Sequence, residues 1–503
     1  MRIRCVDALP PQAWLWHRDG ADAIELTHGK HVRLREDVFF EGCMPTEDLT
    51  ALADQAEVFG SGGVRQPDGW LFVPPSHTLE AIYVYRHHKA VTVSNSLAFL
   101  ASYLSLDLPW HPSYAARFAS AVLGIEDYRR HLGEARGGSL SRYVYDNIRV
   151  DASGTVEIVR KPEPPSFDSY AAYIDYVSSV VGGLFADGVS DESARNYRPL
   201  ATCSRGYDSP CTAALAARHG CREAVTLANS RQGGSDDGSA VGEALGLTVH
   251  RFDRPDRVSG GFGAIAEFLA TGMGGEDYCY KAFQDWLPGR IFITGFHGGA
   301  IWGLQPEPND VLARKDISGA SLQEYRLWTD FVHVPVPMIA ARRHPDISRI
   351  SHSPEMSAYR LNCDYDRPIP RRVLEEAGVP RDAFGQKKQA ASILVFQDRT
   401  MLGDQALRER NEQLPWLWRC RAYVGLHSIA WHLRMKVRAV CRRCYPYAPH
   451  LSRRIEWRVI PKWQIFEHAH PACSFDMLAA IKWVARRYQT CLRSHAASQE
   501  SRR

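Results

Sequence analysis

Short apolar runs and helical stretches alternate through the middle of the chain. The runs that predict buried strands lie at 200–203, 223–229 and 247–253. After the first run, an Ala/Leu-rich stretch opens with Asp208 and stops at Gly220, which predicts a helix with a C-terminal glycine. This alternation is typical of a parallel sheet covered by helices. Such sheets bind ligands at the carboxyl ends of their strands.

The flanking regions have other patterns. Alternating runs at 70–74, 81–87 and 90–94 predict a β-rich region over residues 1–160. Tyr170 to Phe185 is apolar at helical spacing and predicts a helix packed on the sheet. The stretch 332–337 alternates but contains two prolines, so it is either an edge strand or a loop. Residues 365–388 predict a turn, a helix that stops at Gly378 and a further helix.

The turn after the first predicted strand contains Ser204, Arg205, Gly206 and Tyr207. Asp208 and Ser209 follow at the helix start, where acids and hydroxyls cap free N–H groups. A glycine-bearing turn before a helix N-terminus is also a common anion site, because outward N–H groups and the helix dipole favour phosphate. These residues fit both an ordinary strand–turn–helix connection and a phosphate loop.

The sequence SRGYDS at 204–209 resembles the pyrophosphate loop, S-G-G-x-D-S, of asparagine synthetases and related ATP pyrophosphatases. AVTLAN at 224–229 resembles the strand that lines their adenine pocket, and SDDGSAVGEALGLTVH at 235–250 resembles the segment that follows. FGQKKQA at 384–390 resembles their late R-x-K stretch, which supplies a catalytic lysine and gives that role to Lys387.

This resemblance implies a fold and a set of ligands. The fold would be α/β, with a parallel-sheet, HUP-type nucleotide-binding domain behind a smaller β-rich domain similar to a degenerate Ntn amidotransferase. The ligands would be ATP and Mg²⁺. The residues that would bind ATP and its pyrophosphate are Ser204, Arg205, Gly206, Asp208, Ser209 and Leu227. Asp208 would also hold the metal, and the catalytic residues would be Lys387, Asp208 and His297.

Some positions depart from the family pattern. Arg205 replaces a glycine, and it either adds a phosphate contact or blocks the close approach of the backbone. In the turn within 289–303, the places of the family acids, one of which binds magnesium, are taken by Phe296, Gly299 and Ala300. His297 is the ionisable side chain left in that turn, either as a satisfied structural histidine or as a contact to substrate or phosphate.

Two other places carry residues that suit metal ions. Glu276 and Asp277 form an acidic turn that is either solvated surface or a further source of magnesium or amine ligands. Cys441 and Cys444 form a lone C-x-x-C, and zinc would need two more ligands. Nearby candidates are His427, His432 and His450.

Asparagine synthetases carry an N-terminal glutaminase domain of layered sheets, whose nucleophile is a cysteine exposed directly after Met1. This chain has Arg2 there, and Cys5 lies too far along to use the terminal amine as its base. We therefore expect residues 1–160 to form a non-catalytic domain and expect no glutamine hydrolysis by this chain.

Composition sets broader bounds. The chain has 503 residues, which suits two or three domains, and 45% of them are hydrophobic. No apolar run reaches the roughly 18 residues of a membrane span, and the N-terminus lacks the apolar core of a signal peptide. The 12 cysteines lack the spacing of a disulfide framework, which suits a reducing, cytoplasmic location.

The C-terminal region, 415–503, is basic, with roughly 17 Lys and Arg against about 4 Asp and Glu in a chain of net charge +4. It either closes the ATP-binding domain over 161–414 with helices, or offers a basic surface to an anionic partner or lipid headgroups. No nucleic-acid module is recognisable. Ser474 is expected to cap a final helix over 475–493, whose apolar stripe holds Met477, Ile481, Val484 and Tyr488.

The leading expectation is a ligase that forms a carbon–nitrogen bond. It would activate a carboxylate on a small molecule or peptide with ATP, release AMP and pyrophosphate, and form an amide with an amine donor. The first alternative keeps ATP and amidates a sugar acid or modifies a peptide. The second is a non-catalytic nucleotide-binding scaffold or regulator. Gly299 and Arg205 favour the scaffold, whereas Asp208, Ser209 and Lys387 favour the enzyme.

Overall fold

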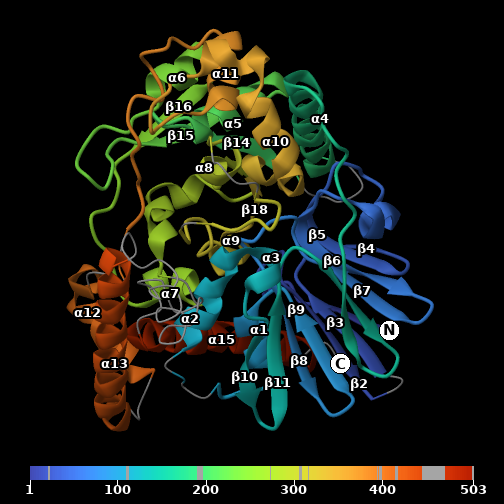
Figure 1. Ribbon diagram of the computed structural model, residues 1–503. Helices are drawn as coiled ribbons and strands as arrows, with labels where there is room; N and C mark the ends of the chain where they lie inside the picture. The colour runs from blue at the N-terminus through green and yellow to red at the C-terminus, as the bar shows by residue number, and fades with distance from the viewer. Residues whose placement is uncertain are drawn as a thin grey trace.

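A computed structural model describes residues 1–20, 23–108, 111, 113–189, 196–271, 274–304, 309–314, 316–393, 395, 399–413, 417–444 and 471–500. The architecture is mixed α/β, with two largely antiparallel sheets and one parallel sheet. Figure 1 shows the strands of the first two sheets together, and the parallel sheet among helices at the other end of the molecule.

The N-terminal region is a sandwich of two sheets. The seven-stranded sheet has the order β1–β3–β2–β9–β8–β11–β10, with β1 (Arg2–Cys5), β2 (Trp14–Asp19), β3 (Ala23–His28), β8 (Ile82–His87), β9 (Ala90–Ser94), β10 (His131–Ala135) and β11 (Gly138–Tyr143). The six-stranded sheet has the order β13–β12–β7–β6–β5–β4, with β4 (Arg33–Arg35), β5 (Val38–Cys43), β6 (Phe59–Gln66), β7 (Gly69–Val73), β12 (Asn147–Asp151) and β13 (Val156–Val159). Alternate side chains of both sheets meet in one core that includes Trp14, Trp16, Trp70 and Phe72. The predicted β-rich region is confirmed.

The parallel sheet contains five strands in the order β16–β15–β14–β17–β18. The strands are β14 (Arg198–Thr202), β15 (Glu223–Leu227), β16 (Thr248–Phe252), β17 (Arg290–Thr294) and β18 (Phe331–Pro335). The three strands predicted from apolar runs are confirmed, and the stretch around 332–337 supplies the edge strand β18. Leu200 and Ala201, neighbours on β14, pack into two different apolar clusters, because both faces of the sheet are covered.

Helices surround the parallel sheet and connect it to the sandwich. Their bounds are α1 (Leu97–Tyr103), α2 (Tyr114–Ala119), α3 (Gly124–Asp127), α4 (Tyr170–Gly188), α5 (Asp208–Arg218), α6 (Ser239–Ala244), α7 (Gly263–Leu269), α8 (Gly298–Ile301), α9 (Gln323–Thr329), α10 (His344–His352), α11 (Pro368–Glu376), α12 (Gly403–Glu412), α13 (Leu417–Cys444) and α15 (Pro471–Glu500). Short 3-10 turns are η1 (Leu49–Asp54), η2 (Ser120–Leu123), η4 (Glu276–Trp286), η5 (Val336–Met338), η6 (Ala341–Arg343), η7 (Pro354–Tyr359) and η8 (Arg399–Leu402).

The C-terminal helix α15 packs against both α1 and α7, so it joins the sandwich region to the parallel-sheet region (Figure 1). Tyr488 stacks on Phe99 with ring centroids 4.9 Å apart, and the predicted apolar stripe is buried. The prediction that Ser474 caps this helix is wrong. The helix begins at Pro471, and the Ser474 hydroxyl accepts a hydrogen bond from the Ala115 N–H at 3.1 Å.

The basic stretch after 416 forms the long helix α13, which exposes apolar side chains along one line: Leu426, Ile429, Leu433, Val437 and Val440. Among the described residues, no helix has the length and apolar character needed to cross a membrane. The further helix predicted after Gly378 does not form, since Gly385 and its neighbours lie in turns against the loop that follows β14.

Candidate functional site

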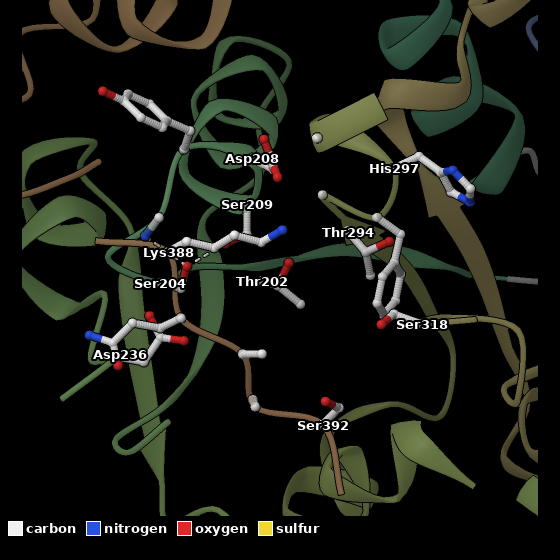
Figure 2. Close-up of a pocket in the computed structure, with 18 of the residues that line it drawn as sticks. Thr202, Ser204, Asp208, Ser209, Asp236, Thr294, His297, Ser318, Lys388 and Ser392 are labelled. Atoms are coloured by element: carbon white, nitrogen blue, oxygen red, sulfur yellow. Dashed lines mark hydrogen bonds between the residues drawn. The ribbon is translucent and has the colours of Figure 1, made fainter. Parts of the chain in front are cut away.

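A cleft of about 680 Å³ opens where β14, β15 and β17 end. Its volume suits a small-molecule ligand. The turn after β14 contributes Ser204, Gly206, Asp208 and Ser209 to its lining, and β15 contributes Leu227. Figure 2 shows the labelled polar side chains of the lining, with Ser204 and Asp236 on one side and His297 and Ser318 on the other.

The turn 204–207 is held by its own hydroxyl groups. The Ser204 Oγ accepts a hydrogen bond from the Gly206 N–H at 3.1 Å and another from the Ser209 hydroxyl at 2.9 Å. The first turn of α5 has no side-chain cap among the described residues. The prediction that Asp208 and Ser209 cap this helix is therefore wrong, because both side chains have other partners. The first-turn N–H groups thus face the cleft end of the helix without a protein cap.

Asp208 is ion-paired with Arg367, the residue that immediately precedes α11. The guanidinium is 8% exposed and the carboxylate 23%, and both residues line the cleft. Burial alone would lower the pKa of Arg367, but the charge of Asp208 raises it, so the arginine stays positive. Asp208, which the sequence predicts to bind a metal ion, is therefore already paired with the guanidinium of Arg367.

The glycine-rich turn after β17 packs directly on this ion pair. A Cβ on Gly298 would lie 2.3 Å from Cγ of Asp208, and one on Gly295 would lie 2.5 Å from the Ser209 nitrogen. At Gly299, where the resembling family has an acid, a Cβ would lie 2.7 Å from Nη2 of Arg367. The glycines are needed because Asp208 and Arg367 fill the space beside them.

The residues present do not fit a magnesium ion. Phe296, Gly299 and Ala300 supply no carboxylate, and Asp208 is neutralised by Arg367. Among the described residues, no cluster of three His, Cys, Asp or Glu side chains could hold a metal. The predicted role of Asp208 as a magnesium ligand is thus at odds with the donor set around it.

His297 lies in the cleft wall, half-buried and in the left-handed region at φ 73°. Its Nε2 accepts a hydrogen bond from Nη1 of Arg314 at 2.9 Å. Burial, Arg314 and His333 hold the pKa of His297 well below its usual value, so the ring is neutral. The geometry matches the satisfied structural histidine more closely than a proton donor.

Glu276 and Asp277 are buried, which corrects the expectation of a solvated acidic turn. Asp277 accepts hydrogen bonds from the N–H of Gly319 at 2.8 Å and from the hydroxyl of Ser321 at 2.6 Å. Burial, followed by the charge of Asp277, raises the pKa of Glu276 to about 8. Both acids fix the chain around 318–321, and neither is free to serve a metal.

The lysine that lines the cleft is Lys388 rather than Lys387. Both are exposed and lie in a segment without regular secondary structure. The predicted catalytic role of Lys387 therefore lacks support in the geometry. Figure 2 shows Lys388 in the cleft with Ser204 and Ser209.

Arg205 does not belong to the cleft lining. Its backbone fixes the loop: the N–H donates to Oδ1 of Asp236 at 3.3 Å, and the carbonyl accepts from the N–H of Gly385 at 2.8 Å. Burial raises the pKa of Asp236 to about 6. The phosphate contact predicted for Arg205 is not part of this arrangement.

The end of the cleft beside β15 is apolar, and its walls are Val225, Leu227, Cys279, Tyr280 and Phe283. Such walls suit the flat face of a base, whereas the opposite end presents hydroxyl and N–H groups. The candidate residues from the sequence that line the cleft include Ser204, Gly206, Asp208, Ser209, Leu227, Asp277 and His297.

No protein-family model matches this chain, and the curated proteins contain no match to it. The function is therefore inferred from the residues of the cleft. Sequence reasoning missed Arg367, Arg314 and Asp236, which all line it, and gave the catalytic role to Lys387 although Lys388 is the neighbour that lines the cleft. A lysine pair was visible in the sequence, but nothing local marks which arginine pairs with Asp208.

The remaining candidates lie elsewhere. The side chains of Cys444, His427 and His450 are outside the described residues, so the zinc prediction stays a prediction. Cys5 stands on the strand β1, and burial, followed by Asp7, raises the pKa of its thiol. A raised pKa disfavours the thiolate that nucleophilic attack requires.

Proposed function

We propose that this protein binds ATP in the cleft and couples its cleavage to AMP and pyrophosphate with amide formation between a carboxylate and an amine. The observation that carries the proposal is the loop 204–209, which presents paired hydroxyls and an uncapped helix start at the carboxyl end of a parallel sheet. The fold would be a HUP-type domain, as the resemblance to asparagine synthetases implies.

The residues present fit a nucleoside triphosphate. Leu227 and Phe283 would contact the base, and Ser204, Ser209 and the first-turn N–H groups of α5 would bind phosphate oxygens. Lys388 and Arg367 would offset the phosphate charge. ATP would supply the AMP group that activates the carboxylate. The amine would come from solution, a partner or the substrate, because Cys5 is a poor nucleophile.

Titration calorimetry of ATP with the full chain tests binding, and pyrophosphate release with panels of carboxylates and amines tests turnover. We expect Ser204→Ala to weaken ATP binding about tenfold by removing one side of the hydroxyl pair. Ser153→Ala is the matched control, since Ser153 also bonds within a turn but lies in the sandwich. If both variants bind ATP with the same affinity, the loop 204–209 does not contribute to the nucleotide site.

A nucleotide-binding scaffold or regulator is the second candidate, and the Asp208–Arg367 ion pair favours it. ATP binding without pyrophosphate release across the panels would support this candidate. The free thiols of the described cysteines support the proposed cytoplasmic location. The basic helix α13 supports the proposal of an anionic partner at the C-terminal region.

A further inference from the structure

Arg367 lines the cleft and pairs with Asp208, the residue to which the sequence resemblance gives the metal. Its guanidinium pairs with the carboxylate of Asp208, lies 5.1 Å from the ring centroid of Tyr365, and lies 2.7 Å from the position that a Cβ on Gly299 would take. These contacts come from α5, from the turn after β17 and from the segment before α11. The side chain is therefore fixed by its surroundings rather than by one partner.

We infer that Arg367 takes the place of a divalent metal in this cleft, so that the phosphates of a nucleotide bind here without magnesium. This inference rests on the proposed function, because it concerns the same phosphate loop. It goes further in naming the residue that supplies the positive charge and in removing the cation from the site.

The donor set supports a guanidinium and opposes a hard cation. Magnesium prefers an octahedron of oxygen ligands, and Asp208, the carboxylate of the phosphate loop, already pairs with a guanidinium. Asp366 also lines the cleft: its Oδ2 accepts hydrogen bonds from the N–H groups of Leu361 at 2.6 Å and Asn362 at 2.8 Å, whereas its Oδ1 has no hydrogen-bond partner among the described residues. In the described part of the chain, the acidic side chains do not gather into a group of three that could hold a metal. A guanidinium has five N–H donors, so Arg367 can keep Asp208 and still bind a phosphate oxygen.

Space gives an independent reason. A side chain at residue 299 would require Arg367 to move, since its Cβ alone would lie 2.7 Å from Nη2. Glycine at 299 and arginine at 367 are therefore a matched pair: the first removes an acid, and the second fills the room with a guanidinium that pairs with Asp208. A site that held magnesium through an acid at 299 would need the opposite pair.

The test measures binding of two probes, ATP and inorganic pyrophosphate, to the full chain by calorimetry, once in EDTA and once in magnesium. We expect the Kd of each probe in EDTA to lie within about threefold of its value in magnesium. Binding more than about tenfold tighter with magnesium would overturn the inference and leave the proposed function intact. If pyrophosphate binds in EDTA but ATP does not bind, the inference about Arg367 stands and the proposed function is wrong. If neither probe binds, both the inference and the proposed function are wrong.

Variants assign the effect to the side chain. Arg367→Met should weaken metal-free pyrophosphate binding about ten- to hundredfold, and Arg367→Lys should restore part of it. Arg372→Met is the matched control: Arg372 lies in the adjoining helix α11, pairs with Glu355 and Glu376, and does not line the cleft. Melting temperatures show that each variant folds. Equal losses in Arg367→Met and Arg372→Met would contradict the assignment.

The double variant Arg367→Ala/Gly299→Asp reverses the matched pair. It frees the space beside residue 299 and places a second carboxylate near Asp208. We expect its pyrophosphate binding to be weak in EDTA and to recover in magnesium. If the double variant binds pyrophosphate equally well in EDTA and in magnesium, the charge of Arg367 is dispensable and the inference is wrong.

Discussion

Nε2 of His297 accepts its hydrogen bond from a guanidinium, that of Arg314, across 2.9 Å. A protonated imidazole could not accept this bond, so the contact requires a neutral ring. Arg314 is 8% exposed and its Nε and Nη2 have no hydrogen-bond partner among the described residues. This part of the cleft wall therefore carries one fixed positive charge and one neutral histidine.

This contact predicts a pH dependence of stability. Burial, Arg314 and His333 lower the folded-state pKa of His297 well below 6.5, so below pH 6.5 the unfolded state takes up the proton first. The contribution of His297 is present above pH 6.5 and is lost as the pH falls below it. His297→Asn suits the left-handed backbone and removes the titrating ring. Between pH 6.5 and 5.5, the wild type should lose about 1 kcal/mol more unfolding free energy than this variant.

Urea unfolding of both proteins at the two pH values measures the difference. Other buried groups also make the unfolding free energy depend on pH in this range. Their contributions cancel only when the wild type is compared with the variant. A constant gap between wild type and variant would show that folding does not lower the pKa of His297.

The neighbouring lysines predict unequal effects on nucleotide binding. Lys388→Ala should raise the Kd for ATP about three- to tenfold, because its ammonium lines the cleft, whereas Lys387→Ala should leave it unchanged. Calorimetry on both variants under one buffer condition decides between them. A larger loss from Lys387→Ala would restore the residue that the sequence motif favours.

The glycines of the turn after β17 predict a steric effect. Gly298→Ala places a methyl group 2.3 Å from Cγ of Asp208, so the turn must shift and we expect a loss of about 2 kcal/mol together with weaker ATP binding. Gly425→Ala is the control, since no atom lies within 4 Å of its Cβ in the helix α13. That control should be neutral or slightly stabilising. Denaturant titration measures the unfolding free energy of the two variants. Equal free energies would contradict the close packing of Gly298 on Asp208.

A buried ionic cluster predicts that the sandwich and the parallel-sheet region depend on one another. Arg326 in α9 pairs with Glu41 of β5 at 2.8 Å and with Glu80 at 2.7 Å, and all three are at most 3% exposed. Arg326→Met should cost about 3 to 5 kcal/mol of unfolding free energy, because it leaves two buried carboxylates without a positively charged partner. Arg65→Met, which breaks an exposed pair with Asp37, should have no measurable effect. Similar unfolding midpoints for the two variants would contradict this view.

The sequence predicts the sheet and its site to different depths. The strands β14, β15 and β16 follow from runs of apolar residues, since a strand buried on both faces has a strong local signal. The loop 204–209 was likewise visible, because glycine and hydroxyl residues before a helix have local chemistry. What surrounds Asp208 was not visible. Arg367 comes from a distant segment, and tertiary packing alone brings the two together.

Register and burial set a second limit. Lys387 and Lys388 differ by one position, and the direction of each depends on a segment that forms no regular element. Glu276 and Asp277 read as surface acids, yet partners from 318–321 bury them. Local sequence carries no trace of partners that arrive from another part of the chain.

The helix α15 has a consequence for how the protein is made. The residues it covers belong to early segments: Ala115 donates to Ser474, 359 positions later, and Phe99 stacks on Tyr488. On the ribosome, the apolar sides of α1 and α2 emerge long before the helix that covers them is translated. Contacts between residues so far apart in the sequence slow folding and leave hydrophobic surface exposed in the meantime. We therefore expect chaperones to bind nascent chains of this protein until α15 is released.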